Sequence, residues 1–363
     1  MANEMETPKY LLLKEALRAR MDQGSLISGQ KIPSENELAR EFGISRQTVR
    51  QAVGELVSEG LLYRIKGSGT YVSHLEGEKR EKSGIIGVMV TYLDDYIFPG
   101  IIKGIDEVLS QNGRSIILGC TYNKLEREAA CLQNMLDKNV DGLIVEPTKS
   151  ALPNPNLIYY ERLKKERIPF LFINGYYPAL ESSYVIEDDE LSGYLAANHL
   201  FELGHEAVGG IFKIDDIQGH GRYGGMSRAH REHKKAIPED AVVWYTTENR
   251  EELFSGENGN ALIEKFKKCT AVICYNDQIA QSLMELFLSR GIKVPETISV
   301  VGFDDSELAV AGSFKLTTLA HPKEELGKQA AQGLLRIIGG RQKQVREKML
   351  PRLIVRNTTD RKK

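Results

Sequence analysis

From Gly84 onward, the chain alternates short, wholly apolar runs with segments of helical periodicity. The runs IIGVMV at 85–90, GLIV at 142–145 and FLFI at 170–173 are separated by segments such as 126–138, in which apolar residues recur at helical spacing. A strand that is apolar at every position is buried on both faces, and strands joined by helices lie parallel. The alternation therefore predicts an α/β architecture in which helices cover both faces of parallel sheets.

This alternation has too many units for one small sheet. The predicted strands lie at 85–90, 115–119, 142–145, 170–173, 184–186, 208–212, 241–245, 271–275 and 298–303. We therefore expect two doubly wound subdomains with a ligand cleft between their strand ends. The predicted boundaries place about 84–186 and 322–345 in the first subdomain, and about 187–321 and 346–357 in the second.

Residues 34–72 predict a different structure, a winged helix-turn-helix. Ser34 and Glu37 have the spacing of a capping box, Gly43 breaks the first short helix, and Ser45 can cap the second. Apolar residues at helical spacing in the second helix form a buried stripe. The run after Gly60 predicts a strand, a glycine turn and a returning strand. An amphipathic helix over 9–21 completes a head at 8–73, and the charged segment 74–83 predicts a linker.

The start of the second short helix carries the side chains that reading of the major groove requires. Arginine can form a forked pair of hydrogen bonds with guanine, and glutamine can do so with adenine. A helical hairpin with a solvated polar face is the alternative, and a lysine at a helix start is often only solvated. The predicted DNA-contacting residues are Lys9, Ser34, Glu35, Ser45, Arg46, Gln47, Thr48, Arg50, Arg64, Lys66 and Gly67.

Charge and cysteine content limit the other classes of function. The net charge is −2 and the first 73 residues hold ten Lys or Arg against nine Asp or Glu, so attraction to DNA must come from the local placement of charge. Four cysteines without paired spacing favour neither a zinc site nor a disulfide framework. Without a secretory pattern or a long apolar run, we expect a cytoplasmic protein with no membrane segment.

Polar and aromatic side chains follow the predicted strands, where ligands bind in doubly wound sheets. Such a mixture suits a sugar, because carboxylate, amide and guanidinium groups bracket hydroxyls and aromatic rings stack on the apolar sugar face. A phosphate would need a glycine-rich loop, and none follows a strand. The predicted ligand-binding residues are Tyr92, Tyr96, Phe98, Glu146, Asn174, Asp188, Gln218, Arg222, Asn276, Asp304 and His321.

Several of these residues have a plain structural alternative. Asp188 can cap the helix that follows it, as can Asp277 beside Asn276. Tyr92 and Phe98 can be core aromatics, and His321 can be a satisfied buried histidine. Arg222, in the sequence GRYGG at an expected helix start, is harder to explain without an oxygen-rich ligand.

Two family resemblances agree with these predictions. KIPSENELAREFGISRQTVRQAVGELVSEGLL at 31–62, followed by GSGTYV, resembles the reading heads of the GntR family. The region 84–357 resembles the effector domain of the LacI/GalR family, which is similar to periplasmic sugar-binding proteins. The motifs that carry this second resemblance are IIGVMVTYLDDYIFPGIIKGI, VDGLIVEP, HLFELGH, CYNDQIA, VGFDD, LTTLAHPKEELG and MLPRLIVR.

The LacI/GalR resemblance implies sugar contacts for Arg222, Asn276, Asp304 and Asn174. The position of His321 is often glutamine in that family, which leaves its role open. A GntR-type head on a LacI/GalR-type body, together with PKY, KIPSENELAREFG and YIFPGIIKGI, resembles the arabinose-responsive repressors. That resemblance implies L-arabinose as effector, whereas the residue chemistry alone reaches only a small polyhydroxylated ligand.

The sequence thus predicts a homodimeric repressor that binds double-stranded operator DNA and is released by a sugar, with neither metal nor cofactor. One alternative is a repressor that responds to another small sugar. A second is a sugar kinase or dehydrogenase, which the absence of a phosphate loop and of a nucleotide fingerprint disfavours. A third is a transport protein, which the attached head and the missing secretion signal disfavour.

Overall fold

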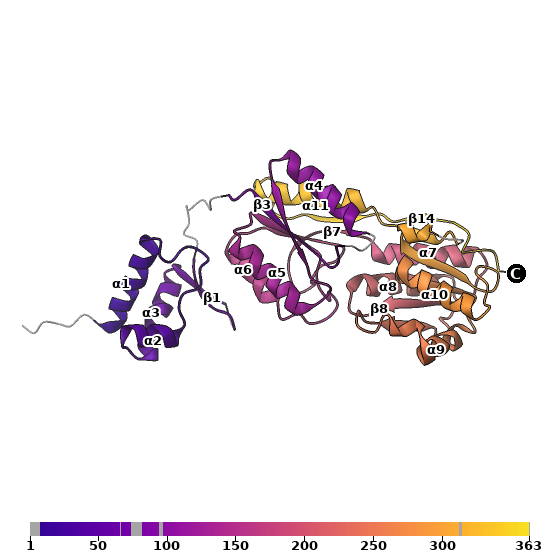
Figure 1. Cartoon of the computed structure of the whole chain (residues 1–363), viewed down its shortest axis with the longest axis horizontal. Helices are drawn as coiled ribbons and strands as arrows, with labels where there is room; N and C mark the ends of the chain where they lie inside the picture. Colours follow the sequence, from indigo (N-terminus) through magenta and orange to yellow (C-terminus); the bar gives the residue numbers. More distant parts are fainter. Residues whose placement is uncertain (1–7, 66, 74–81, 94–96, 312–313, 363) are drawn as a thin grey trace, which may run out of the picture. The chain divides into compact units, whose positions relative to one another are not determined.

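The computed structural model describes residues 8–65, 67–73, 82–93, 97–311 and 314–362. By its internal contacts the chain divides into two compact units, Met1–Lys82 with Pro155–Ile168 and Ser83–Asn154 with Pro169–Lys363 (Figure 1). The predicted linker falls mainly on 74–81, and the predicted contacts of Lys66 and Tyr96 also lie outside the described residues.

The N-terminal head is a three-helix winged helix. Its elements are α1 (Lys9–Asp22), α2 (Glu35–Phe42), α3 (Arg46–Ser58), β1 (Leu62–Ile65) and β2 (Gly69–Val72). The predicted capping box is present, with Glu37 N–H donating to Ser34 Oγ and Ser34 N–H donating to Glu37 Oε2. Gly43 ends α2 at φ 60°, which a glycine adopts without steric cost. Ser45 then caps α3, so the turn follows from the local sequence.

The core of the head is the stripe that helical spacing predicts on α3. Val49, Val53 and Leu56 are buried against Leu13 and Leu17 of α1, and Leu38 of α2 joins the same cluster. β1 and β2 form an antiparallel hairpin that pairs Leu62 with Val72. This packing leaves the N-terminal turn of α3 outside the core.

The larger unit contains two six-stranded sheets. In the first, all neighbouring strands are parallel; its spatial order is β13 (Arg346–Met349), β7 (Ser183–Glu187), β6 (Phe170–Ile173), β5 (Gly142–Val145), β3 (Ile85–Val90) and β4 (Ser115–Cys120). The order of the second is β14 (Arg352–Ile354), β12 (Thr317–Ala320), β11 (Ser299–Asp304), β10 (Ala271–Cys274), β8 (Val208–Lys213) and β9 (Val242–Tyr245). Only the β12–β14 pair of the second sheet is antiparallel.

Helices cover the sheets as the alternation predicts, and Figure 1 shows the two layered subdomains within this unit. α4 (Phe98–Gln111) and α11 (Lys323–Ile338) share a core with one face of the first sheet. On the second sheet, α7 (Asp189–Glu202) and α8 (Ile217–Glu232) cover one face. The opposite face packs on α9 (Gly256–Phe266) and α10 (Asp277–Ser289).

The remaining described helices are one of thirteen residues, whose Met135 lies against Gly87 of β3 and Gly119 of β4, and three shorter ones. They are α5 (Leu125–Asp137), α6 (Leu157–Lys165), η1 (Glu252–Phe254) and η2 (Glu307–Ala309). Among the described helices, none combines the length and the apolar character needed to cross a bilayer. Within the same residues, no three His, Cys, Asp or Glu side chains gather in a way that could hold a metal ion.

The chain crosses between the two subdomains three times, and one crossing corrects a predicted boundary. The crossings lie between β7 and α7, between β12 and α11, and between β13 and β14. We predicted that residues 346–357 belong to the second subdomain, but β13 pairs with β7 of the first sheet and only β14 joins the second. The predicted end at 357 also stops short, because Thr358 and Lys362 still make backbone hydrogen bonds to the second subdomain.

Candidate functional site

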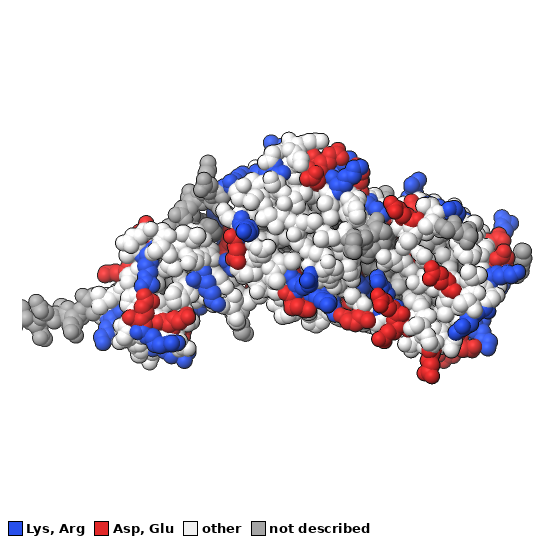
Figure 2. Space-filling view, viewed as in Figure 1, with Lys and Arg blue, Asp and Glu red and all other residues white. Residues whose placement is uncertain are grey.

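The first candidate surface is the N-terminal turn of α3. Arg46, Gln47 and Arg50 are exposed there, and Thr48 is partly buried, with its hydroxyl 2.8 Å from Ser45 Oγ. Basic and acidic side chains are interspersed on the head face seen in Figure 2, so a reading surface depends on where individual arginines point. The other predicted contacts in the described part of the head, Lys9, Ser34, Arg64 and Gly67, are exposed as well.

Glu35 holds the guanidinium group of Arg50 in a forked pair. The Nε and Nη2 groups of Arg50 donate to the two oxygens of Glu35 at 3.3 and 2.9 Å, and Arg46 Nη2 lies 4.0 Å from the same carboxylate. The hydrogen bond from Arg50 lowers the pKa of Glu35, which keeps the carboxylate ionised. In the structure, Glu35 is thus a partner of the predicted reading arginine; that it contacts DNA itself stays a prediction.

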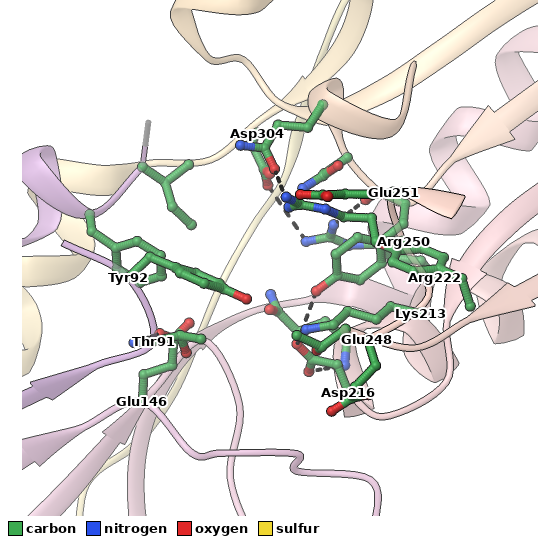
Figure 3. A pocket seen from close by; sticks show the side chains of 18 residues that line it. Thr91, Tyr92, Glu146, Lys213, Asp216, Arg222, Glu248, Arg250, Glu251 and Asp304 are labelled. Carbon is green, nitrogen blue, oxygen red and sulfur yellow. Dashed lines mark hydrogen bonds and ion pairs between the residues drawn. The ribbon is translucent and has the colours of Figure 1, made fainter. Parts of the chain in front are cut away.

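The second candidate site is a cavity of about 320 Å³ between the strand ends of the two subdomains. This volume is near the lower end of the roughly 300–1,000 Å³ typical of small-molecule pockets. Figure 3 shows side chains from both sides facing it, with Thr91, Tyr92 and Glu146 on one side and Lys213, Asp216 and Arg222 on the other. The site therefore lies where ligands bind in doubly wound sheets.

Arg222 occupies the centre of the wall formed by the second subdomain. Its Nε donates to Asp189 Oδ1 at 2.9 Å, and an Nη group donates to the backbone oxygen of Tyr275. The guanidinium lies over the rings of Tyr275 and Phe303, 4.9 and 4.5 Å from their centroids. The distance from Arg222 Nη2 to Asp304 Oδ1 is 3.8 Å. With a fixed orientation and full burial, Arg222 can offer directed donors to a ligand oxygen.

The position of Arg222 depends on two glycines. Contrary to the sequence prediction, Arg222 is not at a helix start but in the second turn of α8, after the cap at Asp216. α7 and α8 pack backbone against backbone, since a Cβ at Gly193 would meet the oxygen of Arg222 at 1.9 Å and one at Gly225 would meet the oxygen of Glu190 at the same distance. This close approach brings the arginine beside Asp189.

The wall formed by the first subdomain is built around Glu146. Its carboxylate accepts hydrogen bonds from Thr91 N–H at 2.7 Å and from Asn174 Nδ2 at 3.0 Å. Burial raises its pKa to about 7, although both hydrogen bonds act in the opposite direction. Asn174 Oδ1 in turn accepts from His321 Nε2 at 3.1 Å. Glu146 can accept from a ligand hydroxyl when ionised and donate when protonated.

The charges around the cavity favour a neutral ligand. Five carboxylate residues and three basic residues line it, and these are Glu146, Asp216, Glu248, Glu251, Asp304, Lys213, Arg222 and Arg250. The excess of carboxylates repels an anion such as a sugar phosphate. Alternating donors and acceptors beside the rings of Tyr92, Tyr245 and Tyr275 match the hydroxyls and apolar face of a sugar.

Seven of the eleven predicted ligand residues line this cavity: Tyr92, Phe98, Glu146, Gln218, Arg222, Asn276 and Asp304. Asn174 and His321 lie outside the wall and act on it through Glu146. Asp188 also lies outside and caps α7 by accepting from Leu191 N–H. Direct ligand contact by any of them stays a prediction.

The capping alternative for Asp277 is wrong. Asn276 caps α10 by accepting from Ile279 N–H, while it also lines the cavity. The carboxylate of Asp277 is buried and accepts hydrogen bonds from Ser306 and from Thr318 Oγ1. Asp277 therefore braces the loop after β11 against the start of α10.

Sequence reasoning missed part of the cavity wall. The wall residues outside the predicted ligand set are Thr91, Ile97, Lys213, Asp216, Tyr245, Thr247, Glu248, Arg250, Glu251, Tyr275 and Gln278; of these, Lys213 does stand at a predicted strand end, after Phe212. Most of them lie at or after the ends of β8, β9 or β10, and those after β9 would have been found if the rule that ligands bind beyond strand ends had been applied to the strand at 241–245. Burial lowers the pKa of Lys213, but nearby acidic groups, Asp216 and Asp215 foremost, together raise it above its ordinary value, so the side chain stays charged.

Comparison with known proteins divides the chain in the same way. Residues 9–72 match the bacterial regulatory proteins of the gntR family, and residues 197–359 match the periplasmic binding protein-like domain. A LacI family transcriptional regulator from Enterococcus faecium with bound ribose is 26% identical, with a TM-score of 0.62 over 77% of this chain and 100% of that one. The transcriptional regulator CelR in complex with cellobiose (21% identity, TM-score 0.67, 90% of this chain and 100% of that one) shares the fold.

Two curated relatives extend over nearly the whole chain. An arabinose metabolism transcriptional repressor of Geobacillus stearothermophilus is 41% identical over 362 residues, which cover 98% of this chain and 99% of the relative. Another from Halalkalibacterium halodurans is 40% identical over 368 residues, covering 98% and 97%. This chain therefore belongs to the family of arabinose metabolism transcriptional repressors, which are DNA-binding regulators and not enzymes.

Proposed function

We propose that this repressor binds a near-palindromic operator as a homodimer in the cytoplasm and releases it when L-arabinose fills the cavity. The observation that carries the proposal is the cavity itself, with Arg222, Glu146 and Asp304 directed at it and aromatic rings beside them. The names of the two curated relatives favour arabinose over other small sugars.

The head supports the DNA-binding part of the proposal. Arg46, Gln47 and Arg50 can reach base edges from the start of α3, while Arg64 on β1 is suited to a backbone contact. In a two-fold dimer, the two α3 helices enter successive major grooves about 34–36 Å apart, which requires near-palindromic operators. The dimer is checked by sedimentation of the protein with and without operator.

The effector is tested by titrating operator DNA with the full-length protein, with and without L-arabinose. The operator is a near-palindromic duplex taken from DNA upstream of arabinose-utilisation genes. Coupling between two sites is typically about 1–3 kcal/mol, so operator affinity should fall about 5- to 150-fold. D-arabinose at the same concentration is the control for stereospecific recognition. Unchanged affinity with L-arabinose would refute it as the effector.

A repressor responding to another small sugar is the second candidate, because the cavity wall suits neutral polyols in general. Calorimetric titration with a panel of pentoses and hexoses separates the two candidates. If L-arabinose is the effector, it binds at least about tenfold more tightly than its stereoisomers, since a misplaced hydroxyl leaves buried polar groups such as Glu146 unpaired.

A further inference from the structure

The two subdomains are joined by side-chain contacts at the end of the cleft opposite the three crossings. The crossings involve β7 and β13 of the first sheet and β12 and β14 of the second, which lie at one end of each strand order. The joining contacts come from the loops after β4 and β5 and after β8 and β9, towards the other end of each order. A hinge at the crossings would separate these loops furthest.

Asn123, after β4, makes the most buried of these contacts. Its Nδ2 donates to Asp215 Oδ2 at 3.2 Å and to Thr247 Oγ1 at 2.5 Å. Its Oδ1 accepts from Lys149 N–H at 2.8 Å, so both ends of the amide are used. The backbone at Asn123 has φ 54°, a conformation that asparagine tolerates better than most residues. Asn123 is buried but does not line the sugar cavity.

Ser150 and Lys149, after β5, make the second and third contacts. Ser150 Oγ donates to Asp216 Oδ1 at 3.0 Å and accepts from Ile217 N–H at 3.0 Å. Lys149 Nζ lies 2.5 Å from Glu248 Oε1. On the second subdomain, all the partners therefore belong to the loops after β8 and β9.

The same two loops carry part of the sugar cavity wall. Asp216 lines the cavity; its Oδ2 accepts from Tyr275 Oη at 3.0 Å, while its Oδ1 caps α8 and also accepts from Ser150 Oγ. Glu248 lines the cavity as well. A ligand that orders these loops would thus also position the groups that reach the first subdomain.

We propose that Asn123, Lys149 and Ser150, by binding Asp215, Asp216 and Glu248, form a latch that holds the cleft closed over the sugar and sets how slowly the sugar leaves. Because it concerns sugar occupancy, the latch rests on the proposed function. Hinge opening must break every latch contact at once, whereas the crossings remain covalent. The latch residues of the first subdomain are positioning residues, since none of the three lines the cavity.

The test uses full-length protein and three substitutions on the first subdomain. Asn123→Asp sets a carboxylate against Asp215, and like charges in contact are costly, so L-arabinose affinity should fall about 10- to 100-fold. Ser150→Ala removes the hydrogen bonds with Asp216 and Ile217, Lys149→Ala removes the ion pair with Glu248, and each should weaken affinity about 2- to 10-fold. Calorimetry measures affinity, and stopped-flow dilution should assign the loss to faster sugar dissociation with little change in association.

Two matched variants control for the chemistry of the substitutions. Asn198→Asp also sets a new carboxylate against an acidic group, Glu202, but within α7. Ser110→Ala also removes a serine hydrogen bond to a carboxylate, that of Asp106 within α4. Both should bind L-arabinose like the unmodified protein.

Amide hydrogen exchange supplies a readout that a general loss of stability would not reproduce. Sugar should slow exchange of Ile217 N–H and Thr247 N–H, which donate to Ser150 Oγ and Asp215 Oδ2. In Ser150→Ala, sugar should still protect the Thr247 amide but no longer the Ile217 amide. Equal protection of both amides in that variant contradicts the latch.

The outcomes separate the latch from the proposed function. If the unmodified protein binds L-arabinose and the three latch variants bind it equally well, the latch is wrong. If circular dichroism shows that Asn123→Asp does not fold, the L-arabinose affinities of Ser150→Ala and Lys149→Ala test the latch instead. If the unmodified protein does not bind L-arabinose, the proposed effector fails. The latch is then tested by the radius of gyration from X-ray scattering, which should be larger for Asn123→Asp than for Asn198→Asp because the cleft opens. Equal radii of gyration would contradict the latch.

Discussion

Single side chains in this protein are oriented by partners that sequence spacing does not reveal. Arg50 was predicted from its place on α3, but its direction depends on Glu35, which lies on a different helix and forms both hydrogen bonds with its guanidinium. His321 likewise acts on the cavity through Asn174. The type of residue at these positions could be read from the sequence, but the partner that positions it could not.

Arg50→Ala should weaken operator binding by about 1–3 kcal/mol per recognition helix, because a forked contact with a base is lost. Fluorescence anisotropy with operator and with a scrambled duplex measures this loss, which should be confined to the operator. Arg18→Ala is the matched control, since Arg18 also pairs with a glutamate, Glu59, on the head surface but lies on α1. Equal operator binding by Arg50→Ala and the unmodified protein would mean that Arg50 does not read bases.

His321 should make the fold sensitive to acid. Burial lowers the pKa of this imidazole to about 4, with Lys323 and Arg222 acting in the same direction and Asp304 opposing them. The unfolded chain takes up this proton near pH 6.5 and the folded chain only near pH 4. The free energy of unfolding should therefore fall by roughly 3 kcal/mol between these values, at about 1.4 kcal/mol per pKa unit.

Urea unfolding at pH 7, 5 and 4 measures this effect in His321→Gln, which can still donate to Asn174 but does not titrate. The variant should lose less stability between pH 7 and 4 than the unmodified protein. His220→Gln, at an exposed position, is the control and should lose as much as the unmodified protein. Parallel pH dependence of His321→Gln and the unmodified protein would contradict the assignment.

At the scale of elements, the packing of α7 on α8 decides where the cavity arginine lies. Gly225→Ala should destabilise the protein by about 1–3 kcal/mol, because its Cβ would meet the oxygen of Glu190 at 1.9 Å and push the helices apart. Sugar affinity should fall with it as Arg222 moves. Thermal unfolding and calorimetry provide the two measurements.

Gly224→Ala is a control one residue earlier in the same helix, where a Cβ would have no atom within 4 Å. It should leave sugar affinity unchanged and stabilise the protein by up to about 1 kcal/mol, owing to the better helix propensity of alanine. If the two variants behave alike, close packing of α7 on α8 is not what positions Arg222.

The sequence predicted the strands and the winged helix because their signals are local. A short apolar run such as Phe170–Ile173, rich in residues that favour strands, indicates a buried strand from its own composition, and the capping box at Ser34 needs only its neighbours. The sheet that β13 joins could not be read, since REKM places three charged residues in succession, and its pairing with β7 is a long-range contact. Asn276 and Asp277 are both good caps, and only the extended backbone of Asn276 decides between them.

The cavity was predicted less completely than the fold for a related reason. Thr247, Glu248 and Arg250 lie in a polar segment, and its composition is that of any solvated loop. Their place in the wall follows from the register of β9 beside β8 at the edge of the second sheet. Such placement depends on the assembled sheet, which no short window of sequence contains.

At the scale of the whole molecule, the effect of sugar on DNA binding must be reciprocal. If L-arabinose weakens operator binding by a given factor, saturating operator must weaken L-arabinose binding by the same factor. Calorimetric titration of the protein with L-arabinose in the presence of operator measures that factor, and a scrambled duplex should leave sugar affinity unchanged. A mismatch between the two factors would mean that a third equilibrium, such as dimer dissociation, takes part.

The strands β13 and β14 are separated by only two residues and follow every other described strand in the sequence, yet each completes a different sheet. During synthesis, neither half of the larger unit can acquire this edge strand until the ribosome has translated every other described strand of both sheets. A premature stop codon just before β13 would therefore damage both halves together, and the nascent polypeptide must be protected from aggregation until these two strands emerge.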